Sequence, residues 1–546
     1  MSRQPLSYLT LAPQPHFDDP DYKIPHFMET QPRVLSAISD YLHTQAGQAL
    51  VLKCEQVDVY GQCLRSYICS QYPIEDDRVV SQLYYTQHML FGRVHNANSA
   101  CSLEQGLVHH AKNGVLILGV EPLIQHPHWW FRLKSILLTQ VFHWELSDKS
   151  NLPYVPPQPL TFKLILLGSR EQLASLYQLD ETLYAFSQYS EIEHYLDTST
   201  PERLQQWGGL VQYLSQQIAG KCFDAEGLTA LYQLGVRESE DAYLQPIALP
   251  SLTAKIEAIS AQCQQDKINQ SAVWNYFRRV RYQQSSLSEL SQREFINQHI
   301  FIETDGQCVG QVNGLSVVEY AGTPISFGEP SRITCTVQLG EGEITDVERK
   351  NDLAGNVHSK GTMLAQYCLA HLLHLPAQLP FAAAIVFEQS YADIDGDSAS
   401  LAQFCALVSA LADVPIFQHI AITGAIDQSG HVHSVGGVNQ KIEGFFHLCQ
   451  HRGLTGQQGV IIPQITQSQL SLQPDIIDAV KAGQFHIWGV ENVEQALAIL
   501  TALPLFDEQS GQSLSELIST RLESIPQSAV KQMYHAALSL LTKLKK

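Results

Sequence analysis

Short apolar runs separated by stretches with helical spacing organise the first third of the chain. Apolar runs stand at Ala49–Leu52, Val115–Leu118 and Leu164–Leu167, each of a length typical of a buried strand. This alternation predicts an α/β domain over residues 34–199. Residues 200–294 show no strand signal and are rich in Leu, Gln, Ala and Glu, so we expect a helical domain there.

The pattern changes near residue 295, where the chain becomes β-rich. Glycines punctuate this part at Gly306, Gly310, Gly314, Gly322 and Gly328. Mixed strand and helix patterns follow, which predicts an α+β domain over 295–503. We interpret residues 1–33 as an irregular arm and residues 504–546 as an extension ending in a lysine-tipped helix. The predicted fold class is therefore α/β and α+β multidomain, with a helical domain in between.

The charge and the cysteine pattern narrow the class of protein. The 546 residues carry a formal net charge of −20, which argues against nucleic acid or an anionic membrane as the main partner. No apolar run approaches the ~20 residues that cross a bilayer, and the N-terminus lacks the apolar core of a secretory signal. The 11 cysteines never occur in CxxC spacing, as expected for free thiols in a reducing compartment. We therefore expect a cytoplasmic protein.

The residue pattern between positions 393 and 441 is typical of a catalytic site rather than of a packed core. Its first part follows an apolar run at Phe381–Phe387 and precedes helical spacing that starts at Leu401. This arrangement places Ser398 at a helix N-terminus. Asp and Ser are also preferred N-cap residues, so capping alone would explain an isolated Asp-Ser pair.

The acidic residues before Ser398 alternate as in the first half of an EF-hand loop. They are Asp393, Asp395 and Asp397. However, Ser398 occupies the sixth loop position, where glycine is needed, and Phe404 stands where the bidentate glutamate belongs. The paired histidines of the chain also lack companion ligands at metal spacing. We therefore expect no metal site.

The second part of this segment delivers a lysine to the start of another helix. Ala421–Ile426 is predicted to be a strand, a turn follows, and Gly436-Gly437 bends the chain into a helix near Lys441. A general base must be neutral, and both burial and a helix N-terminus lower a lysine pKa. Neutrality at pH 7 requires a decrease of about 3, near 4 kcal/mol. With Thr423 to orient the amine, Ser398 and Lys441 would suit a peptidase whose general base is lysine.

These residues resemble the proteolytic domain of the Lon protease family, in its LonB-type branch. Glu388–Ser400 is similar to the nucleophile loop, Lys441 to the general-base lysine, and Thr423-Gly424 to the strand that supports this lysine. Upstream, Gly310–Leu315, Phe327–Thr334 and Val357–Gly361 also fit the family. The resemblance covers about residues 295–503.

The resemblance implies a role for each of these residues. Ser398 would be the nucleophile and Lys441 would take its proton, giving an acyl-enzyme that water hydrolyses. Asp397 would border the site, and Glu348 would be a further neighbour. Backbone N–H groups at the helix start would hold the oxyanion. The implied substrates are unfolded proteins or peptides, and the implied assembly is a homo-oligomer in the form of a hexameric ring.

Residues 34–294 have the outline of the AAA+ ATPase that precedes the protease in this family. Phe91–Ala97, Gly106–Gly114 and Leu164–Gly168 resemble LonB-type ATPase segments, and residues 200–294 would form the helical lid. The groups that bind nucleotide are missing, however. At the positions of G-x-x-x-x-G-K-[ST] stand Gln56, Gly61, Gln62 and Cys63, and Gly119 and Val120 replace the acidic pair that holds magnesium. We therefore expect a degenerate AAA+ domain without ordinary ATP-Mg binding, and no required cofactor.

The sequence leaves three hypotheses. A Ser-Lys endopeptidase without a working ATPase comes first, because capping and packing do not require Ser398, Thr423 and Lys441 together. Such an enzyme would degrade only peptides or already unfolded chains. The alternative is a non-catalytic, ring-forming adaptor or holdase that binds unfolded chains. A third hypothesis keeps the peptidase and adds a weakly bound structural ATP, or a separate ATPase that feeds the ring.

Overall fold

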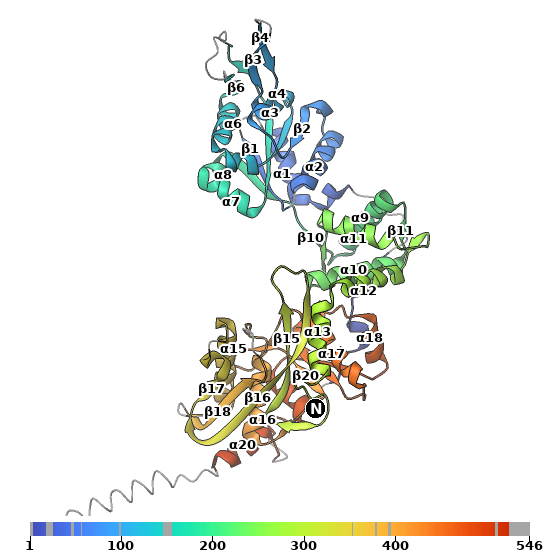
Figure 1. Ribbon diagram of the computed structural model, residues 1–546, viewed down its shortest axis with the longest axis vertical. Helices are drawn as coiled ribbons and strands as arrows, with labels where there is room; N and C mark the ends of the chain where they lie inside the picture. The colour runs from blue at the N-terminus through green and yellow to red at the C-terminus, as the bar shows by residue number, and fades with distance from the viewer. Residues whose placement is uncertain are drawn as a thin grey trace, which may run out of the picture. The chain divides into compact units, whose positions relative to one another are not determined.

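The chain forms two compact units. The computed structural model describes residues 4–17, 26–44, 48–55, 57–97, 100–145, 155–351, 353–376, 379–390, 395–507 and 512–523. The N-terminal unit comprises His16–Leu228 and Tyr243–Val273, and the C-terminal unit comprises Met1–Pro15, Thr229–Ala242 and Trp274–Lys546. Figure 1 shows the helices and strands of both units, coloured along the chain.

The N-terminal unit is built on a parallel five-stranded sheet with the order β2-β5-β8-β1-β9. Its strands are β1 (Ala49–Lys53), β2 (Val79–Gln82), β5 (Val115–Gly119), β8 (Lys163–Gly168) and β9 (Ser187–Glu191). The three apolar runs of the sequence form β5, β8 and β1, so these strand predictions are confirmed. These three strands occupy the centre of the sheet, and β2 and β9 lie at its edges.

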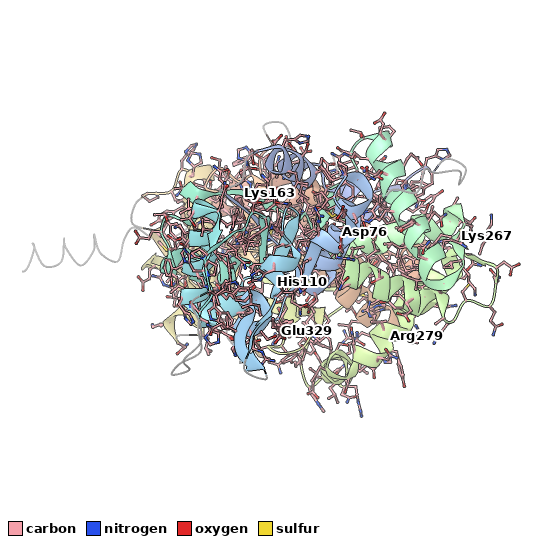
Figure 2. The ribbon with its side chains drawn as sticks, turned by 90° about the horizontal axis from the view of Figure 1, so that it is seen from above. Asp76, His110, Lys163, Lys267, Arg279 and Glu329 are labelled. Carbon is pink, nitrogen blue, oxygen red and sulfur yellow. The ribbon has the colours of Figure 1, made fainter. Side chains whose placement is uncertain are left out.

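Helices pack on this sheet through alternate strand residues. The main ones are α1 (Pro32–His43), α2 (Val57–Gln71), α6 (Pro127–Thr139) and α7 (Arg170–Leu179). Val51, Leu116 and Leu166 pack with Trp130 of α6 in one buried cluster, because every second residue of a strand points to the same face. Lys163, labelled in Figure 2, lies at the start of β8 and donates a hydrogen bond to a carbonyl oxygen of α1 at 2.9 Å.

Residues 200–294 are mostly helical and also contain short strands. The helices are α9 (Pro201–Ala219), α10 (Ala225–Ser239), α11 (Leu249–Ser260), α12 (Gln270–Gln284) and α13 (Ser286–Ile296). β11 (Cys222–Phe223) pairs with β13 (Lys267–Ile268), and β12 (Leu244–Pro246) pairs with β10 (Tyr195–Asp197). The sequence does not predict these short strands, because strands of two or three residues leave no apolar run.

The C-terminal unit is built on a mixed seven-stranded sheet with the order β17-β18-β16-β15-β20-β23-β24. Its strands are β15 (Gln311–Glu319), β16 (Ser326–Gly342), β17 (Ile344–Asp346), β18 (Leu379–Phe387), β20 (Ile420–Ile422), β23 (Gly459–Pro463) and β24 (His486–Val490). β16 runs antiparallel to β15 and β18, and the other pairs are parallel. The predicted run Phe381–Phe387 forms most of β18.

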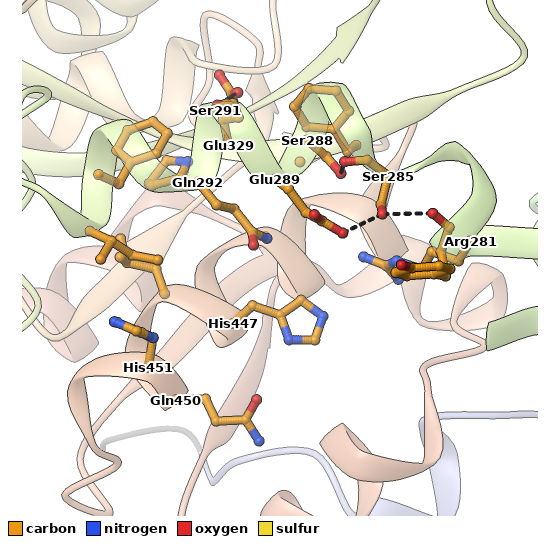
Figure 3. A pocket seen from close by; sticks show the side chains of 18 residues that line it. Arg281, Ser285, Ser288, Glu289, Ser291, Gln292, Glu329, His447, Gln450 and His451 are labelled. Carbon is orange, nitrogen blue, oxygen red and sulfur yellow. Dashed lines mark hydrogen bonds between the residues drawn. The ribbon is translucent and has the colours of Figure 1, made fainter. Parts of the chain in front are cut away.

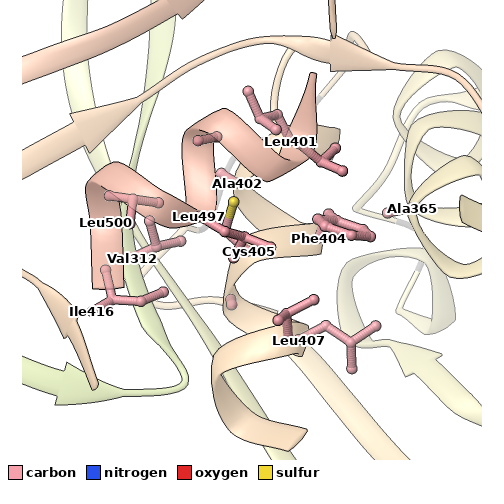
Figure 4. Close-up of a cluster of buried hydrophobic side chains, with 14 of the residues drawn as sticks. Val312, Ala365, Leu401, Ala402, Phe404, Cys405, Leu407, Ile416, Leu497 and Leu500 are labelled. Atoms are coloured by element: carbon pink, nitrogen blue, oxygen red, sulfur yellow. The ribbon is translucent and has the colours of Figure 1, made fainter. Parts of the chain in front are cut away.

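Helices cover both faces of this second sheet. They are α15 (Asn356–Leu372), α16 (Ser400–Ala412), α17 (Val438–Arg452) and α18 (Pro474–Lys481). Ile422 of β20 belongs to the same buried cluster as Leu401 of α16, whereas its neighbour Ala421 belongs to another cluster with Phe445 of α17. Figure 4 shows Leu401 and other residues of the first cluster. Because successive strand residues point to opposite faces, α16 and α17 lie on opposite sides of the sheet.

Both ends of the described chain contribute to the C-terminal unit. The predicted irregular arm contains a short 3-10 helix at Tyr8–Thr10, and Leu11 is fully buried in the cluster on the α17 face. At the other end, α20 (Leu514–Glu523) buries Leu514 and Ile518, and the lysine-tipped end of the predicted extension lies outside the described residues. None of the described helices combines the length and apolar character that crossing a membrane requires.

Candidate active site

Ser398 lies in a turn that leads into α16, at the helix N-terminus that the sequence predicts. The helix begins at Ser400, two residues further on. The Ser398 carbonyl oxygen accepts hydrogen bonds from the N–H of Gly424 at 2.9 Å and from the hydroxyl of Thr423 at 3.2 Å. The N–H of Leu401 donates to the Gly424 carbonyl oxygen at 3.1 Å. The turn is thus joined to the chain that follows β20.

The strand predicted over Ala421–Ile426 is interrupted at this point, so the prediction of one continuous strand is wrong. After β20 the chain forms β21 (Ala425–Ile426), which pairs antiparallel with β22 (Val432–His433). The N–H of Thr423 still donates to β23 at 3.0 Å, but Gly424 bonds to the serine turn through both of its backbone groups. The chain leaves the sheet at Gly424, whose N–H and carbonyl oxygen form hydrogen bonds with Ser398 and Leu401 instead of with a strand.

Helix α15 packs closely behind the acidic residues of the turn. A Cβ at Gly361 would lie 3.1 Å from the Cα of Asp397, and the N–H of His358 donates to Asp395 at 3.4 Å. Such an approach of helix and turn favours a residue without a side chain. Asp393 lies outside the described residues. The Ser398 turn is therefore held from two sides, by α15 and by the chain after β20.

Replacing Thr423 tests how far its hydroxyl supports the turn. The sequence assigned this hydroxyl to the lysine, whereas it is buried and bonds to the Ser398 carbonyl oxygen. Thr423→Val keeps the volume and removes this bond, so we expect the free energy of unfolding to fall by about 1–2 kcal/mol and peptide hydrolysis to slow. Thr423→Ser should retain most of both. Urea unfolding and peptide-cleavage rates measure the two effects, and equal behaviour of the two variants would contradict this role.

Lys441 lies in the first turn of α17 and is only 3% exposed. Burial lowers the pKa of its amine from 10.5 to about 8, against the opposing charges of Glu240 and Asp397. Asp397, which directly precedes Ser398, is thus one of the two acidic residues whose charge acts on the amine. The Ser398 turn precedes α16 and Lys441 lies in α17, so the two residues named by the sequence come from elements on opposite faces of the sheet.

Two glycine contacts set the position of α17 against β16. A Cβ at Gly328 would lie 2.0 Å from the carbonyl oxygen of Gln440 and 2.8 Å from the Cα of Lys441. A Cβ at Gly444 would lie 2.1 Å from the Gly328 carbonyl oxygen. These are contacts with backbone, so the strand and the helix can approach this closely only because both residues are glycine. The family-like segment Phe327–Thr334 therefore helps to position Lys441.

Glu348, the other predicted neighbour of the site, is buried in α14 (Val347–Lys350). Its Oε1 accepts a hydrogen bond from the N–H of Phe387 at 2.9 Å. Burial raises the pKa of the Glu348 carboxyl, although this hydrogen bond opposes the shift. Glu348 thereby ties α14 to the end of β18, the strand that leads toward the Ser398 turn.

A buried polar network that the sequence did not single out joins this region to α16. Asp346 accepts a hydrogen bond from Thr362 at 2.7 Å and lies 3.2 Å from Nε2 of His358, and Gln403 of α16 donates to the Thr362 hydroxyl at 2.9 Å. Burial would raise the pKa of Asp346, but the contacts with His358 and Thr362 hold it at about 2. The sequence feature that could have indicated this network is a pair of polar residues four positions apart on α15, His358 and Thr362.

A cavity of about 440 Å³ adjoins α17 on another side (Figure 3). Arg281 and Glu289, from α12 and α13, line it together with Glu329 of β16 and His447 of α17. The residues that line the cavity include neither Ser398 nor Lys441. The proposed catalytic pair therefore lies outside this cavity.

The region that corresponds to a phosphate-binding loop has a different structure in the N-terminal unit. β1 ends at Lys53 and α2 begins at Val57, which leaves too short a connection to cradle phosphates. Gly61, Gln62 and Cys63 lie within α2, and Gln56 lies outside the described residues. Asp58 in the first turn of α2 adds negative charge where a phosphate would need N–H groups.

The remaining residues of this region are used for packing. A Cβ at Gly61 would lie 3.1 Å from Oγ of Ser81 in β2, so this glycine permits close approach of helix and strand. Burial raises the pKa of the Cys63 thiol to about 12. The Gly119 carbonyl oxygen accepts the Tyr85 hydroxyl at 2.9 Å, and Val120 is fully buried. These residues do not fit ATP-Mg, because they offer neither a cation for phosphate nor carboxylates for magnesium.

Two parts of the chain match known domains. Residues 75–190 match the LonB-like AAA domain, and residues 288–502 match the Lon protease (S16) C-terminal proteolytic domain. A protein named as a Lon protease homolog from Haemophilus influenzae is 43% identical over 97% of this chain and 96% of its own length. A protein of the same name from Escherichia coli is 37% identical over 95% of this chain and 94% of its own length. An archaeal Lon protease of Thermococcus kodakarensis is 24% identical over 78% of this chain and 64% of its own.

The fold and these matches define a protein with an AAA-like domain followed by a protease domain. The chain belongs to the Lon protease family. The resemblance seen in the sequence and the predicted fold class are therefore confirmed.

Proposed function

We propose that this protein is a Ser-Lys endopeptidase that hydrolyses peptide bonds in unfolded proteins and peptides. Ser398 is the nucleophile and Lys441 is the general base. The observation that supports this most is the buried Lys441 amine, whose pKa is lowered to about 8 and which interacts electrostatically with Asp397, the residue before Ser398. The match to the Lon proteolytic domain supports the same class of reaction.

The reaction follows from these two groups. The neutral Lys441 amine removes the proton of the Ser398 hydroxyl as the oxygen attacks the peptide carbonyl carbon. The protonated amine then gives the proton to the leaving nitrogen, the C–N bond breaks, and an ester on Ser398 remains. A water molecule, deprotonated by Lys441, attacks the carbonyl carbon of this ester. The C–O bond to Ser398 then breaks, the protonated amine returns its proton to the serine oxygen, and the carboxylic acid is released.

Backbone N–H groups of the serine turn are the proposed donors to the oxyanion. The N–H of Ser400 already donates to the Asp397 carbonyl oxygen at 3.0 Å, and that of Leu401 donates to Gly424. The N–H groups of Ser398 and Ala399 therefore remain the best candidates near the nucleophile. Such donors stabilise the tetrahedral intermediate because they are already oriented before charge develops on the carbonyl oxygen.

The hydrolysis is proposed to proceed without ATP. Support comes from the short β1–α2 connection and from the packing roles of Gly61, Cys63, Gly119 and Val120. An enzyme without ATP-driven unfolding would act on chains that are already unfolded. Assembly into a hexameric ring, a cytoplasmic location and independence from metal stay predictions from the sequence.

The test is degradation of dye-labelled, unfolded casein by the full-length protein, with and without ATP-Mg. We expect casein to be cleaved at the same rate in both conditions, and a stably folded protein to stay intact. Ser398→Ala is the blank, and Ser468→Ala, an exposed serine of the same unit, is the matched control. Stimulation by ATP would overturn the ATP-independent part of the proposal. Casein that is retained but not cleaved would instead favour a holdase.

A further inference from the structure

The residue that follows α10 reaches the turn from which the lysine helix starts. Glu240 accepts a hydrogen bond from the N–H of Gly437 at 2.8 Å through Oε1. Gly437 is the N-cap of α17 and has a φ of 66°. A Cβ at Gly436 would lie 3.6 Å from the other carboxylate oxygen of Glu240. The Glu240 carboxylate therefore sits directly on the Gly436-Gly437 turn.

The backbone of Glu240 is in a conformation that disfavours glutamate. Its φ is 55°, in the left-handed region. A residue with a side chain costs roughly 1–2 kcal/mol there, and glycine is the usual choice at the end of a helix. Glutamate is thus less favourable than glycine at this position by its backbone conformation alone. The contacts of the Glu240 side chain are therefore candidates for a functional role.

The last turns of α10 are held against α17 by buried contacts within the C-terminal unit. Arg237 donates two hydrogen bonds to the Glu443 carboxylate, at 2.6 and 3.1 Å, and one to the Ser471 carbonyl oxygen at 2.6 Å. The Ser471 hydroxyl donates in turn to the Gln233 carbonyl oxygen at 2.8 Å. The position of Glu240 is thus set by a packed helix rather than by an exposed loop.

Two carboxylates act electrostatically on the Lys441 amine. They are Asp397, before α16, and Glu240, after α10, and both oppose the effect of burial on the lysine pKa. Other acidic groups packed around α17 have partners of their own: Glu443 pairs with Arg237 and Arg281, and Glu329 of β16 accepts a hydrogen bond from Ser291. Asp397 belongs to the turn that carries Ser398. Glu240 is the acidic residue near Lys441 that lies outside residues 288–502, which match the protease domain.

We propose that Glu240 is a positioning residue of the Lys441 site, which fixes the Gly436-Gly437 turn and places a negative charge beside the start of the lysine helix. This inference rests on the proposed role of Lys441 as the base. Glu240 then limits hydrolysis at neutral pH, because a carboxylate near the amine favours the protonated lysine, which cannot accept the serine proton. Any change that withdraws the end of α10 from the turn releases this restraint.

Glu240→Gln separates the charge from the hydrogen bond, because the amide oxygen can still accept the Gly437 N–H. We expect the rise of kcat/KM with pH, on a short fluorogenic peptide, to move to lower pH, so that kcat/KM at pH 7 increases by about three- to tenfold. Glu240→Ala should shift the profile in the same direction but lower its plateau, because the turn loses its bond. Glu226→Gln, at the exposed start of the same helix, is the matched control and should leave the profile unchanged.

A second measurement reports on the amine without catalysis. Competitive labelling of lysines with acetic anhydride at a series of pH values, read by mass spectrometry in the Ser398→Ala background, gives the titration of Lys441 directly. A shift to lower pH in Glu240→Gln and Glu240→Ala, and none in Glu226→Gln, is the expected result. An unmoved titration overturns the inference even if the wild type cleaves peptides. A shifted titration, combined with no cleavage by the protein that retains Ser398, supports the role of Glu240 and refutes the proposed peptidase instead.

Discussion

Lys441→Met should lower kcat for peptide hydrolysis by about 10²–10⁴-fold, the range that a general base typically contributes. Methionine fills a similar volume in the buried site but cannot accept the Ser398 proton. In the wild type, activity should rise with pH around a midpoint near 8, because the Lys441 pKa is lowered from 10.5 to about 8 and only the neutral amine acts as a base. Steady-state rates on a fluorogenic peptide between pH 6 and about pH 10 measure both effects.

The same variant should be more stable than the wild type near neutral pH. The folded protein holds the Lys441 proton less tightly than the unfolded chain, so the buried charge costs about 3 kcal/mol below pH 8, and this cost fades as the pH rises toward 10.5. Lys441→Met removes the cost, so its urea midpoint should be higher at pH 7 and the difference should shrink at higher pH. Lys481→Met, at an exposed lysine of α18 whose amine lies 5.5 Å from the centre of the Tyr8 ring, should leave the rate unchanged and alter stability far less than Lys441→Met. Full activity in Lys441→Met would exclude lysine as the base.

Glu443→Gln should destabilise the C-terminal unit by about 3–5 kcal/mol, because it removes one partner from a buried ion cluster. Glu443 is 2% exposed and accepts hydrogen bonds from Arg237 at 2.6 Å and from Arg281 at 2.9 Å. Without the carboxylate the two guanidinium groups face each other with no negative charge between them. Arg281 can turn partly into solvent, so we expect the lower end of this range. Urea unfolding of the full-length protein measures the change.

The pH dependence provides an independent check on the cluster. Burial would raise the pKa of Glu443, but Arg237 and Arg281 outweigh it and hold the pKa at about 2. The folded-state pKa is thus depressed, so the stabilisation is fully present above about pH 4.5 and is lost as the pH falls toward 2. Glu443→Gln should abolish this part of the acid sensitivity. The double variant Arg237→Met, Glu443→Met should recover much of the lost stability, and an equal loss in single and double variants would argue against the ion pair as the cause.

The sequence predicts the centre of each sheet better than its edges. β1, β5 and β8 are buried on both faces and therefore appear as continuous apolar runs. β9 lies at an edge, and only Ser190 among its residues is buried, so it leaves no such run. The interruption of the strand at Gly424 also escapes the pattern, because it depends on hydrogen bonds to a turn that lies over twenty residues earlier.

Some residues of the candidate site can likewise be predicted from the sequence, and others cannot. Ser398, Thr423 and Lys441 could be named because a family motif places them at fixed spacing. Glu240 could not, because its partner Gly437 lies 197 residues away and nothing local marks the pair. Glu443 resembles an ordinary surface acid on a helix, and only the folded chain shows the two arginines that hold it. Contacts distant in sequence are thus the part of the site that local pattern does not reveal.

The C-terminal unit contains parts of the chain that lie far from the protease domain in the sequence. Residues 288–502 match the proteolytic domain. The compact C-terminal unit that contains them also includes Met1–Pro15 and Thr229–Ala242. Leu11 and Arg237, both outside residues 288–502, supply core packing and a buried counter-charge. A gene shortened to the protease alone would discard these parts of its own interior. Removing everything before residue 288 would therefore damage the unit that contains the protease domain.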